Sequence, residues 1–391
     1  MPQSWVQTSP NSSAQVNEVL VVGGGIVGLS VAWSMRRRGV AVRILERGVC
    51  GQGSTAKATG GIRSQFGSEV NVRLTLASLS TFRDWTLIHG GDVGFRQVGY
   101  LFLATSAAHI EAHRLGAELQ RRCGARVELL DADETSARLP WVVLDDVMGA
   151  SFGPDDGIAD PGAAVASMVS SCRRSGVEIS EGVVVQAIEQ SGGQVTGVTT
   201  TARSIAADVV VICAGPWSAL LAATAGISLP VTPHHRQVYR TGAVRAIPSV
   251  TPFVIDQGTG VYFHSDGGGL IFGGGDRDGA EGFDESFRAE ESPRIIELLS
   301  RRLPQVLDAE LTGGWAGVRD MTPDDLAVVG ALPSPEGAYI ATGFSGHGFM
   351  HAPAIGEEVA RLVAGEAPGL DMATLLPTRF DSALRREPYV F

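Results

Sequence analysis

The feature that most constrains the fold is a glycine-rich turn that directly follows an apolar segment near the start of the chain. Residues 19–22 are all Val or Leu, and Gly23, Gly25 and Gly28 follow with the spacing GxGxxG. In such a turn the first glycine permits the tight bend, the second lets backbone approach a pyrophosphate, and the third lets a helix pack on the strand. N–H groups at the helix start then hold the phosphates. The sequence therefore predicts a strand–turn–helix unit that binds a dinucleotide.

An acidic residue follows at the distance that is typical of a dinucleotide-binding unit. The predicted helix ends at Gly39, a second apolar strand covers residues 41–45, and Glu46 comes 18 positions after Gly28. In dinucleotide-binding folds an acidic residue about 20 positions on binds a ribose hydroxyl. The chain has 50 glycines, so the GxGxxG spacing alone is weak, and the prediction depends on the full order of strand, turn, helix, strand and acid.

Length and charge limit the remaining classes. A chain of 391 residues predicts two domains, one of them interrupted by the other. A net charge of −11 argues against a nucleic-acid partner, which would require a basic face. No apolar run approaches the roughly 18 residues that a membrane span needs. Residues 1–15 are rich in Ser, Gln and Asn, do not read as a secretory signal, and predict a disordered tail.

Cysteine usage indicates a reducing compartment. Cys50, Cys123, Cys172 and Cys213 lie far apart and form no CxxC pair. This spacing predicts neither a metal site nor a disulfide framework, and we expect a cytoplasmic protein. Cys50 falls in a polar loop, where a reactive thiol and an ordinary one are both open.

Alternating segments predict the second domain. After a loop over residues 48–67 that is dense in small residues, the pattern predicts helices and strands in the following order: a helix over 69–87, a strand over 100–104, helices over 107–123 and 133–139, a helix beginning at Asp160-Pro161, strands over 177–179, 183–188 and 195–200, and a strand over 208–213. The last strand returns to the nucleotide domain, and residues 231–288 are rich in strands. Glycines at 267–269 and 273–275 flank one short strand without a helix after it, so they predict a hairpin turn and a tight bend.

Six motifs in order carry a resemblance to a known family over residues 16–365. They are the 23–28 turn, Glu46-Arg47-Gly48, Thr59-Gly60-Gly61-Ile62-Arg63, residues 213–218 (CAGPWS), residues 317–324 (GVRDMTPD) and residues 343–349 (GFSGHGF). The chain resembles the FAD-dependent amine oxidoreductases of the D-amino-acid oxidase superfamily, which include sarcosine oxidase, glycine oxidase and the catalytic subunit of dye-linked proline dehydrogenase.

The resemblance implies an α/β fold of two domains. A Rossmann-like FAD-binding domain would comprise residues 16–90, 145–225 and 312–391, interleaved with an antiparallel-sheet substrate domain of residues 91–144 and 226–311.

The resemblance also implies an extended FAD. Its adenine ribose would lie at Glu46, its pyrophosphate at residues 23–28, and its isoalloxazine between the loops of residues 54–63 and 343–348. Small residues in the second loop, before a helix predicted over residues 354–364, would let N–H groups approach the ring and favour the reduced flavin. The implied cofactor-binding residues are Gly23, Gly25, Ile26, Val27, Gly28, Glu46, Arg47, Ser54, Thr55, Lys57, Gly61, Ile62, Arg63, Val185, Ala214, Gly215, Trp217, Gly343, Gly346, His347, Gly348, Phe349 and Met350.

The family removes a hydride from a carbon beside an amine, and a carboxylated substrate needs a cation in the pocket. By resemblance Arg319 and Arg63 hold that carboxylate. The alternative for each is an ion pair with an acid of its own domain, such as Asp320 or Glu69. His347, Tyr262 and His264 are further candidates to face the substrate, and each has a purely structural alternative.

Four departures from the family pattern refine these expectations. Gly317 stands where monomeric sarcosine oxidase has the cysteine that carries its flavin, and Lys57 stands where dimethylglycine dehydrogenases have the corresponding histidine, so we expect non-covalent FAD. Met350 replaces a carboxylate-binding lysine, which predicts a substrate bulkier than sarcosine. Ile271 aligns with the lysine that promotes oxygen reduction, which favours a dehydrogenase or a slow oxidase.

The predicted function is FAD-dependent oxidation of a secondary amine or small amino acid to an imine, which then hydrolyses, with O2 or another acceptor taking the electrons. Two alternatives stay open at this point. One is a dehydrogenase of 2-hydroxy acids or polyol phosphates on the same scaffold, because a carboxylate-binding cation does not report whether the neighbouring atom is nitrogen or oxygen. The other is a flavoprotein subunit of a multi-chain amino-acid dehydrogenase complex.

Overall fold

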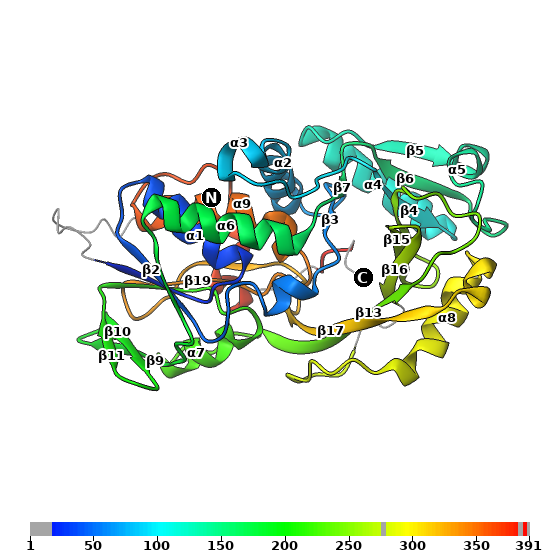
Figure 1. Ribbon diagram of the computed structural model, residues 1–391. Helices are drawn as coiled ribbons and strands as arrows, with labels where there is room; N and C mark the ends of the chain where they lie inside the picture. Colours follow the sequence, from blue (N-terminus) through cyan, green and yellow to red (C-terminus); the bar gives the residue numbers. More distant parts are fainter. Residues whose placement is uncertain (1–17, 275–278, 382–385, 389–391) are drawn as a thin grey trace.

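The computed structural model describes residues 18–274, 279–381 and 386–388 (Figure 1). The tail predicted over residues 1–15 lies outside them. Within the described residues, two large sheets, of six and eight strands, lie side by side, each with helices packed on it (Figure 1). This arrangement confirms the predicted α/β fold with two sheet-based units. No helix in the described ranges is both long and apolar enough to cross a bilayer.

The six-stranded sheet contains the predicted dinucleotide unit. Its strands are parallel apart from the β18–β19 pair, and their order is β18 (Val328–Ala331), β19 (Ala338–Thr342), β12 (Val209–Ile212), β1 (Val19–Val22), β2 (Val42–Glu46) and β8 (Glu178–Glu181). The parallel pairing of β12 with β1 confirms that the chain returns to this sheet after residue 208.

Both faces of this sheet are covered, which explains why β1 is apolar throughout. Val19 and Val21 pack in one cluster with helices α1 (Ile26–Arg37), α6 (Pro161–Ser175) and α9 (Gly348–Val363). Leu20 and Val22 face the opposite side. That side is covered by helix α7 (Ser218–Thr224) and by the small sheet of β9 (Val185–Ser191), β10 (Gln194–Thr200) and β11 (Ser204–Ala206).

The eight-stranded sheet is antiparallel except where β14 pairs with β4. Its order is β17 (Leu311–Met321), β13 (Thr232–Thr241), β16 (Gly269–Gly274), β15 (Val261–Asp266), β14 (Phe253–Asp256), β4 (Tyr100–Ala104), β6 (Gly149–Gly153) and β5 (Glu128–Asp131). Phe263 and Phe272 pack on one face with helix α8 (Ser292–Ser300). The alternate residues Tyr100, Phe253 and Tyr262 form a second cluster on the other face.

Most predicted elements are present with small shifts at their ends. The segment 69–87 forms two helices, α2 (Glu69–Arg83) and α3 (Trp85–His89), and the next two predicted helices are α4 (Ala107–Arg122) and α5 (Ala132–Arg138). Asp160 caps α6 as expected, because its carboxylate accepts hydrogen bonds from the amides of residues 162 and 163. Glycines 267–269 do form the hairpin turn between β15 and β16.

Two strands bear on the domain limits. Both β6 and most of β17 fall inside segments assigned to the FAD-binding domain, yet they pair in the eight-stranded sheet. The domain division remains a prediction. Helix α9 begins at residue 348, six residues before the predicted start, and continues through Pro353, so the 343–348 loop leads directly into its first turn.

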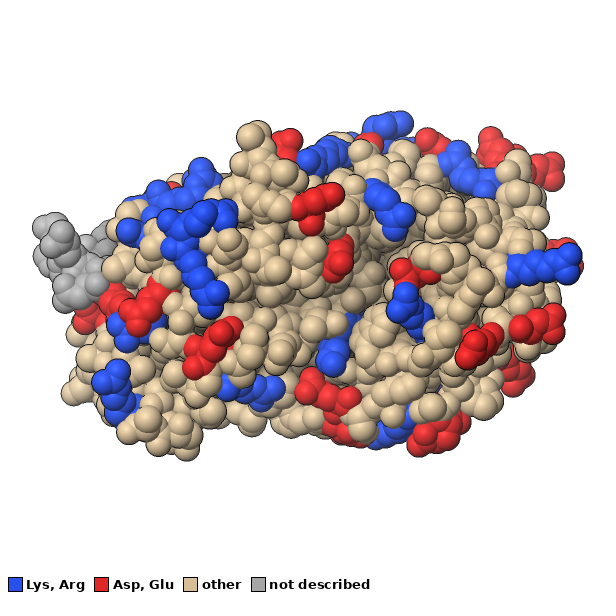
Figure 2. Space-filling view, in the orientation of Figure 1, with Lys and Arg blue, Asp and Glu red and all other residues tan. Residues whose placement is uncertain are grey.

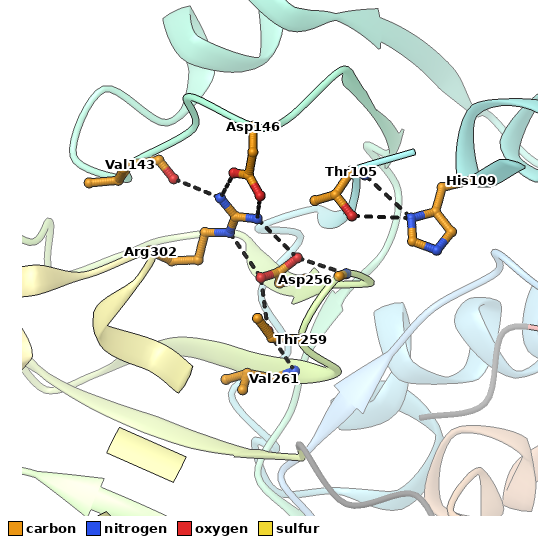
Figure 3. A network of polar contacts seen from close by, with 9 residues as sticks. Thr105, His109, Val143, Asp146, Asp256, Thr259, Val261 and Arg302 are labelled. Atoms are coloured by element: carbon orange, nitrogen blue, oxygen red, sulfur yellow. Dashed lines mark hydrogen bonds and ion pairs between the residues drawn. The ribbon is translucent and has the colours of Figure 1, made fainter. Parts of the chain in front are cut away.

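A buried ion pair joins the segment that follows α8 to the end of β14 (Figure 3). The Arg302 guanidinium donates to Asp256 at 2.9 Å and also contacts Asp146 and the carbonyl of Val143. Asp256 is fully buried and also accepts a hydrogen bond from Thr259 at 2.8 Å. Because the guanidinium neutralises the buried Asp256, loss of Arg302 would leave that carboxylate charge uncompensated.

Candidate functional site

A cavity of about 700 Å³ separates the two large sheets. Figure 2 shows this face of the molecule hollowed near its middle, with charged side chains of both signs around the hollow. The walls come from the 23–28 turn, residues 46–63, the 214–217 segment, the aromatic face of the eight-stranded sheet and residues 344–350. The cavity therefore joins segments that lie far apart in the sequence.

Close backbone contacts account for the glycines of the turn. Gly23 has a φ of +111°, and a Cβ there would lie 2.3 Å from the carbonyl oxygen of Cys213. A Cβ on Gly28 would lie 2.0 Å from the carbonyl oxygen of Gly23. Gly25 lines the cavity at the N-cap of α1, which has no side-chain cap. The amide of Gly24 donates to Glu46 and that of Ile26 to the Thr55 hydroxyl, so the other N–H groups at the start of α1 are those that would meet an anion.

Glu46 braces this turn from the end of β2. Its two carboxylate oxygens accept from the amides of Gly24 at 2.7 Å and Gly48 at 2.8 Å, while the residue lines the cavity. Next to it, the Arg47 guanidinium lies 3.5 Å from the centre of the Trp217 ring. Two predicted cofactor-binding residues that lie 170 positions apart in the sequence are therefore in contact.

The loop after β2 is fastened to β17. The Ser54 hydroxyl donates to the carbonyl of Val318 at 2.7 Å, and the Trp315 indole donates to the carbonyl of Lys57 at 2.9 Å. A Cβ on Gly317 would lie 2.6 Å from Cγ of Lys57. The two positions at which relatives are expected to attach flavin are thus occupied by a glycine and a lysine that pack against each other.

Asp320 organises the 343–346 loop. Its side chain accepts from the amide of Gly343 at 2.7 Å, and its carbonyl accepts from the amide of Ser345 at 2.9 Å. Burial raises the pKa of Asp320, while the groups that donate to its carboxylate, among them the Gly343 amide, act in the opposite direction. The neighbouring Arg319 lies against Gly346, where a Cβ would be 3.2 Å from Cζ of the arginine. Asp320 therefore holds the loop, and Arg319 lines the cavity.

Arg63 is 4% exposed and also lines the cavity. Its guanidinium lies 3.9 Å from the centre of the Phe66 ring and donates to the carbonyl of Gln65. Glu69, named above as an alternative partner, instead forms an ion pair with Arg73 at 2.7 Å. A buried cation thus borders a cavity whose walls are largely apolar.

His347 precedes the first residue of α9 and is 4% exposed. Burial lowers its pKa well below the usual value, and the charges of Arg63 and Arg319 lower it further. Its Nε2 has no hydrogen-bond partner within the described part of the chain. The site therefore presents a neutral imidazole beside two cations.

Stacked aromatic rings form the opposite wall. Phe253 stacks on Tyr100 at 4.3 Å and on Tyr262 at 5.5 Å between ring centres, and all three line the cavity. Burial raises the pKa of both tyrosines, so they keep their protons and present O–H donors. A Cβ on Gly61 would lie 3.0 Å from Oη of Tyr100, which explains the glycine there.

Most predicted site residues line this cavity, and a few lie behind it. Those that line it are Gly23, Gly25, Ile26, Val27, Glu46, Arg47, Ser54, Thr55, Lys57, Gly61, Arg63, Val185, Ala214, Gly215, Trp217, Tyr262, Arg319, Gly346, His347, Gly348, Phe349 and Met350. Gly28, Ile62, Gly343 and His264 are not part of the lining. Gly28 packs on the turn and Gly343 on Thr322, Ile62 belongs to the core, and His264 stacks on Phe253 at 4.9 Å. The individual roles of these residues remain predictions.

Sequence reasoning missed several lining residues. Tyr100, Phe253, Ile255, Arg236 and Phe344 all border the cavity. Tyr100 lies in β4, and Phe253 and Ile255 lie two positions apart in β14. The alternation of side chains along a strand could have indicated that Phe253 and Ile255 share one face of the sheet. It could not have shown which face meets the cavity.

Cys50 does not have the character of a reactive thiol. It is 8% exposed, and burial together with the nearby Glu181 and Glu46 raises its pKa to about 12. The thiolate form is therefore scarce at neutral pH. Of the two interpretations left open for this residue, the ordinary thiol agrees with the structure.

The donor set fits the dinucleotide cofactor that the resemblance implies. The cavity is lined by the start of α1, by an acidic residue at the end of β2 and by a largely apolar chamber, in which Nε2 of His347 has no partner among the described residues. These groups suit a pyrophosphate at the turn, an adenine ribose at Glu46 and a flat ring in the apolar chamber.

Comparison with known proteins identifies the family. Residues 18–362 match the model of the FAD dependent oxidoreductase family, DAO. The chain is 28% identical to the formaldehyde-forming 4-methylaminobutanoate oxidase of Paenarthrobacter nicotinovorans over 95% of its own length, but it spans only 46% of that relative. It is 29% identical to glycine oxidase of Geobacillus kaustophilus, covering 93% of this chain and 97% of the oxidase.

Solved structures agree with these matches. L-Proline dehydrogenase from P. horikoshii superimposes with a TM-score of 0.89 at 30% identity, covering 95% of this chain and all of that one. The predicted FAD cofactor and the predicted class, an FAD-dependent oxidoreductase of amines or amino acids, are confirmed. The chain belongs to the FAD-dependent oxidoreductase family of D-amino-acid oxidase type.

Proposed function

We propose that the protein oxidises a carboxylated secondary amine or small amino acid to an imine, which water then hydrolyses. One observation carries the proposal: Arg63 and Arg319, on separate segments, both line the cavity and both lower the pKa of His347. Two guanidinium groups that converge on one point of a largely apolar chamber are suited to a carboxylate, because Arg supplies charge-assisted hydrogen bonds in pairs.

The chain's own groups would orient the substrate and exclude water. Arg63 and Arg319 would hold the carboxylate, and the wall of Tyr100, Phe253 and Tyr262 would pack against the apolar part of the substrate. His347 stays neutral, so it adds no third positive charge to the arginine pair. Bound FAD supplies the hydride acceptor.

We further propose that FAD is held without a covalent bond. Support comes from Gly317 and Lys57, which occupy the expected attachment positions and offer neither cysteine nor histidine. Ile271 supports a dehydrogenase or slow oxidase, because it supplies no positive charge at the position that the resemblance aligns with the oxygen-activating lysine. The electron acceptor is then O2 or another molecule.

The cellular setting belongs to the same proposal. We propose a cytoplasmic location, which the four cysteines support because all are free and none is paired in a disulfide. Partner subunits are proposed on the family resemblance alone. Size-exclusion chromatography of the native protein tests them, since co-eluting chains would support a complex.

Anaerobic titration of the FAD-loaded protein tests the proposed function. N-methyl, cyclic and unsubstituted amino acids and 2-hydroxy acids are added in turn while the flavin absorbance is followed, and air is then admitted. Bleaching by an amine that carries a carboxylate, and not by its decarboxylated amine, is the expected result. Bleaching only by hydroxy acids would contradict the proposal, and the rate of recovery in air separates oxidase from dehydrogenase.

A further inference from the structure

We propose that Asp156 is a positioning residue for Arg63: its carboxylate fixes the buried segment that carries the arginine and so sets the affinity of the site for a substrate carboxylate. The inference rests on the proposed carboxylate-binding role of Arg63. Asp156 belongs to the turn between β6 and β7 (Gly157–Ile158), and β7 pairs with β3 (Gly61–Ile62), the strand that leads into Arg63.

The carboxylate of Asp156 is fully buried and holds Ser64 at two atoms. One oxygen accepts from the Ser64 amide at 2.8 Å and from the Ser64 hydroxyl at 2.7 Å. The other oxygen lies 3.4 Å from the side-chain nitrogen of Gln65, which donates to the carbonyl of Tyr100 at 2.9 Å. Asp156 therefore fixes the two residues that follow Arg63.

Arg63 in turn depends on this segment for its orientation. Its guanidinium donates to the carbonyl of Gln65 and lies on the ring of Phe66. Ser64 and Gln65 are themselves at most 2% exposed, so water does not replace a lost contact easily. If the main chain at Ser64 and Gln65 shifts, the acceptor that orients Arg63 shifts with it.

An acidic residue at this buried place is costly for folding alone. Burial raises the pKa of Asp156 to about 7, whereas the hydrogen bonds from Ser64 and Gln65 and the charge of Arg63 act in the opposite direction. A group that is unfavourable for burial yet holds the segment beside a lining cation is typical of a functional site. The geometry, rather than this shift, identifies which segment it serves.

Calorimetric titration of the FAD-loaded protein with benzoate tests the inference without using activity. Benzoate supplies a carboxylate on a flat ring, and benzamide is the uncharged probe. We expect Asp156→Ala to weaken benzoate about tenfold, as for a displaced charge-assisted hydrogen bond, and to leave benzamide nearly unchanged. Asp156→Asn, which keeps an acceptor for Ser64, should recover most of the affinity.

A double variant and a matched control separate positioning from general destabilisation. Because Asp156 acts through Arg63, adding Asp156→Ala to Arg63→Met should cause no further weakening. Asp256→Asn, at an equally buried aspartate that belongs to the network in Figure 3 and does not line the cavity, should lower stability while leaving benzoate affinity unchanged.

Three results would overturn the inference. Additive losses in the double variant would show that Asp156 does not act through Arg63, and an equal loss in Asp256→Asn would show a merely structural effect. If Arg63→Met itself leaves benzoate binding unchanged, the proposed carboxylate site fails, and the inference fails with it. Should Asp156→Ala not fold, Ser64→Ala decides, because it removes the hydroxyl that donates to Asp156 at 2.7 Å. Benzoate affinity identical to wild type in Ser64→Ala, with full loss in Arg63→Met, would contradict the inference.

Discussion

The glycines of the dinucleotide turn should fail in two different ways when each is replaced by alanine. A Cβ on Gly28 would lie 2.0 Å from the carbonyl oxygen of Gly23, about 1 Å inside the 3.0 Å that real Cβ atoms respect. The obstacle is backbone, so α1 must move away from β1. Overpacking of this kind costs about 1–3 kcal/mol. In a chain of this size we expect the Tm to fall by about 1–4 °C.

Gly25→Ala should leave the fold intact and impair cofactor binding. Gly25 has a φ of −71° and a ψ of 174°, which alanine adopts without strain, and a Cβ there would meet only the hydroxyl of Thr55 at 3.3 Å. Because residue 25 lines the cavity, the added methyl group occupies space in the phosphate cradle. We expect FAD affinity to fall at least about tenfold, the equivalent of 1.4 kcal/mol.

The assay measures thermal unfolding of the apoprotein and the Kd of FAD for both variants. Comparing apoproteins removes the stabilisation that bound FAD itself contributes. The expected pattern is a low Tm for Gly28→Ala, with weak FAD binding at a nearly normal Tm for Gly25→Ala. Normal FAD binding by Gly25→Ala, or a normal Tm for Gly28→Ala, would refute the assignment of the two roles.

Three further predictions follow from other parts of the structure. Burial raises the pKa of Asp156 from 3.8 to about 7, so between these values the folded state keeps a proton that the unfolded chain has lost. Denaturant unfolding should therefore show the free energy of unfolding falling by about 1.4 kcal/mol per pH unit between about pH 4 and pH 7. Asp156→Asn should remove that slope. Asp256→Asn weakens one of the two carboxylate contacts of Arg302 and leaves the other, to Asp146, in place. The free energy of unfolding, measured with urea, should fall by about 1.5–3 kcal/mol, whereas unchanged stability would show that the pair is solvated. Arg319→Met should raise the KM of a carboxylated substrate about 10-fold or more, with FAD content unchanged. Its control is Arg240→Met, which removes an exposed ion pair with Asp266 at 2.8 Å. Equal KM values in the two variants would exclude Arg319 from the site.

Local features were predictable because local chemistry sets them. The turn at residues 23–28, the acid at Glu46 and the Asp160-Pro161 helix start depend on hydrogen bonds and steric limits within a few residues, or on one β–α–β unit. The structure has each of them at the predicted place. The family motifs extended this prediction to FAD and to the enzyme class.

The tertiary structure decided which sheet each strand joins and which of its two faces meets the cavity. The apolar run of β4 predicts a strand, but its two faces are equally apolar in sequence, and only the sheet shows that Tyr100 meets the cavity while Leu101 and Leu103 meet the core under α8. For the same reason β6 could not be assigned to a sheet by its position in the chain. A strand specifies a period of two, and its neighbours decide which side is buried.

The sequence by itself thus determined the dinucleotide unit, the order of the elements and the candidate cations. The tertiary structure alone decided how those cations are held. Ser64 and Asp156 are 92 positions apart, and Asp320 turned out to bind the amide of Gly343, 23 positions on, instead of its neighbour Arg319. A buried carboxylate takes whichever N–H and O–H groups the fold brings within about 3 Å, because leaving it unsatisfied costs more than any local preference.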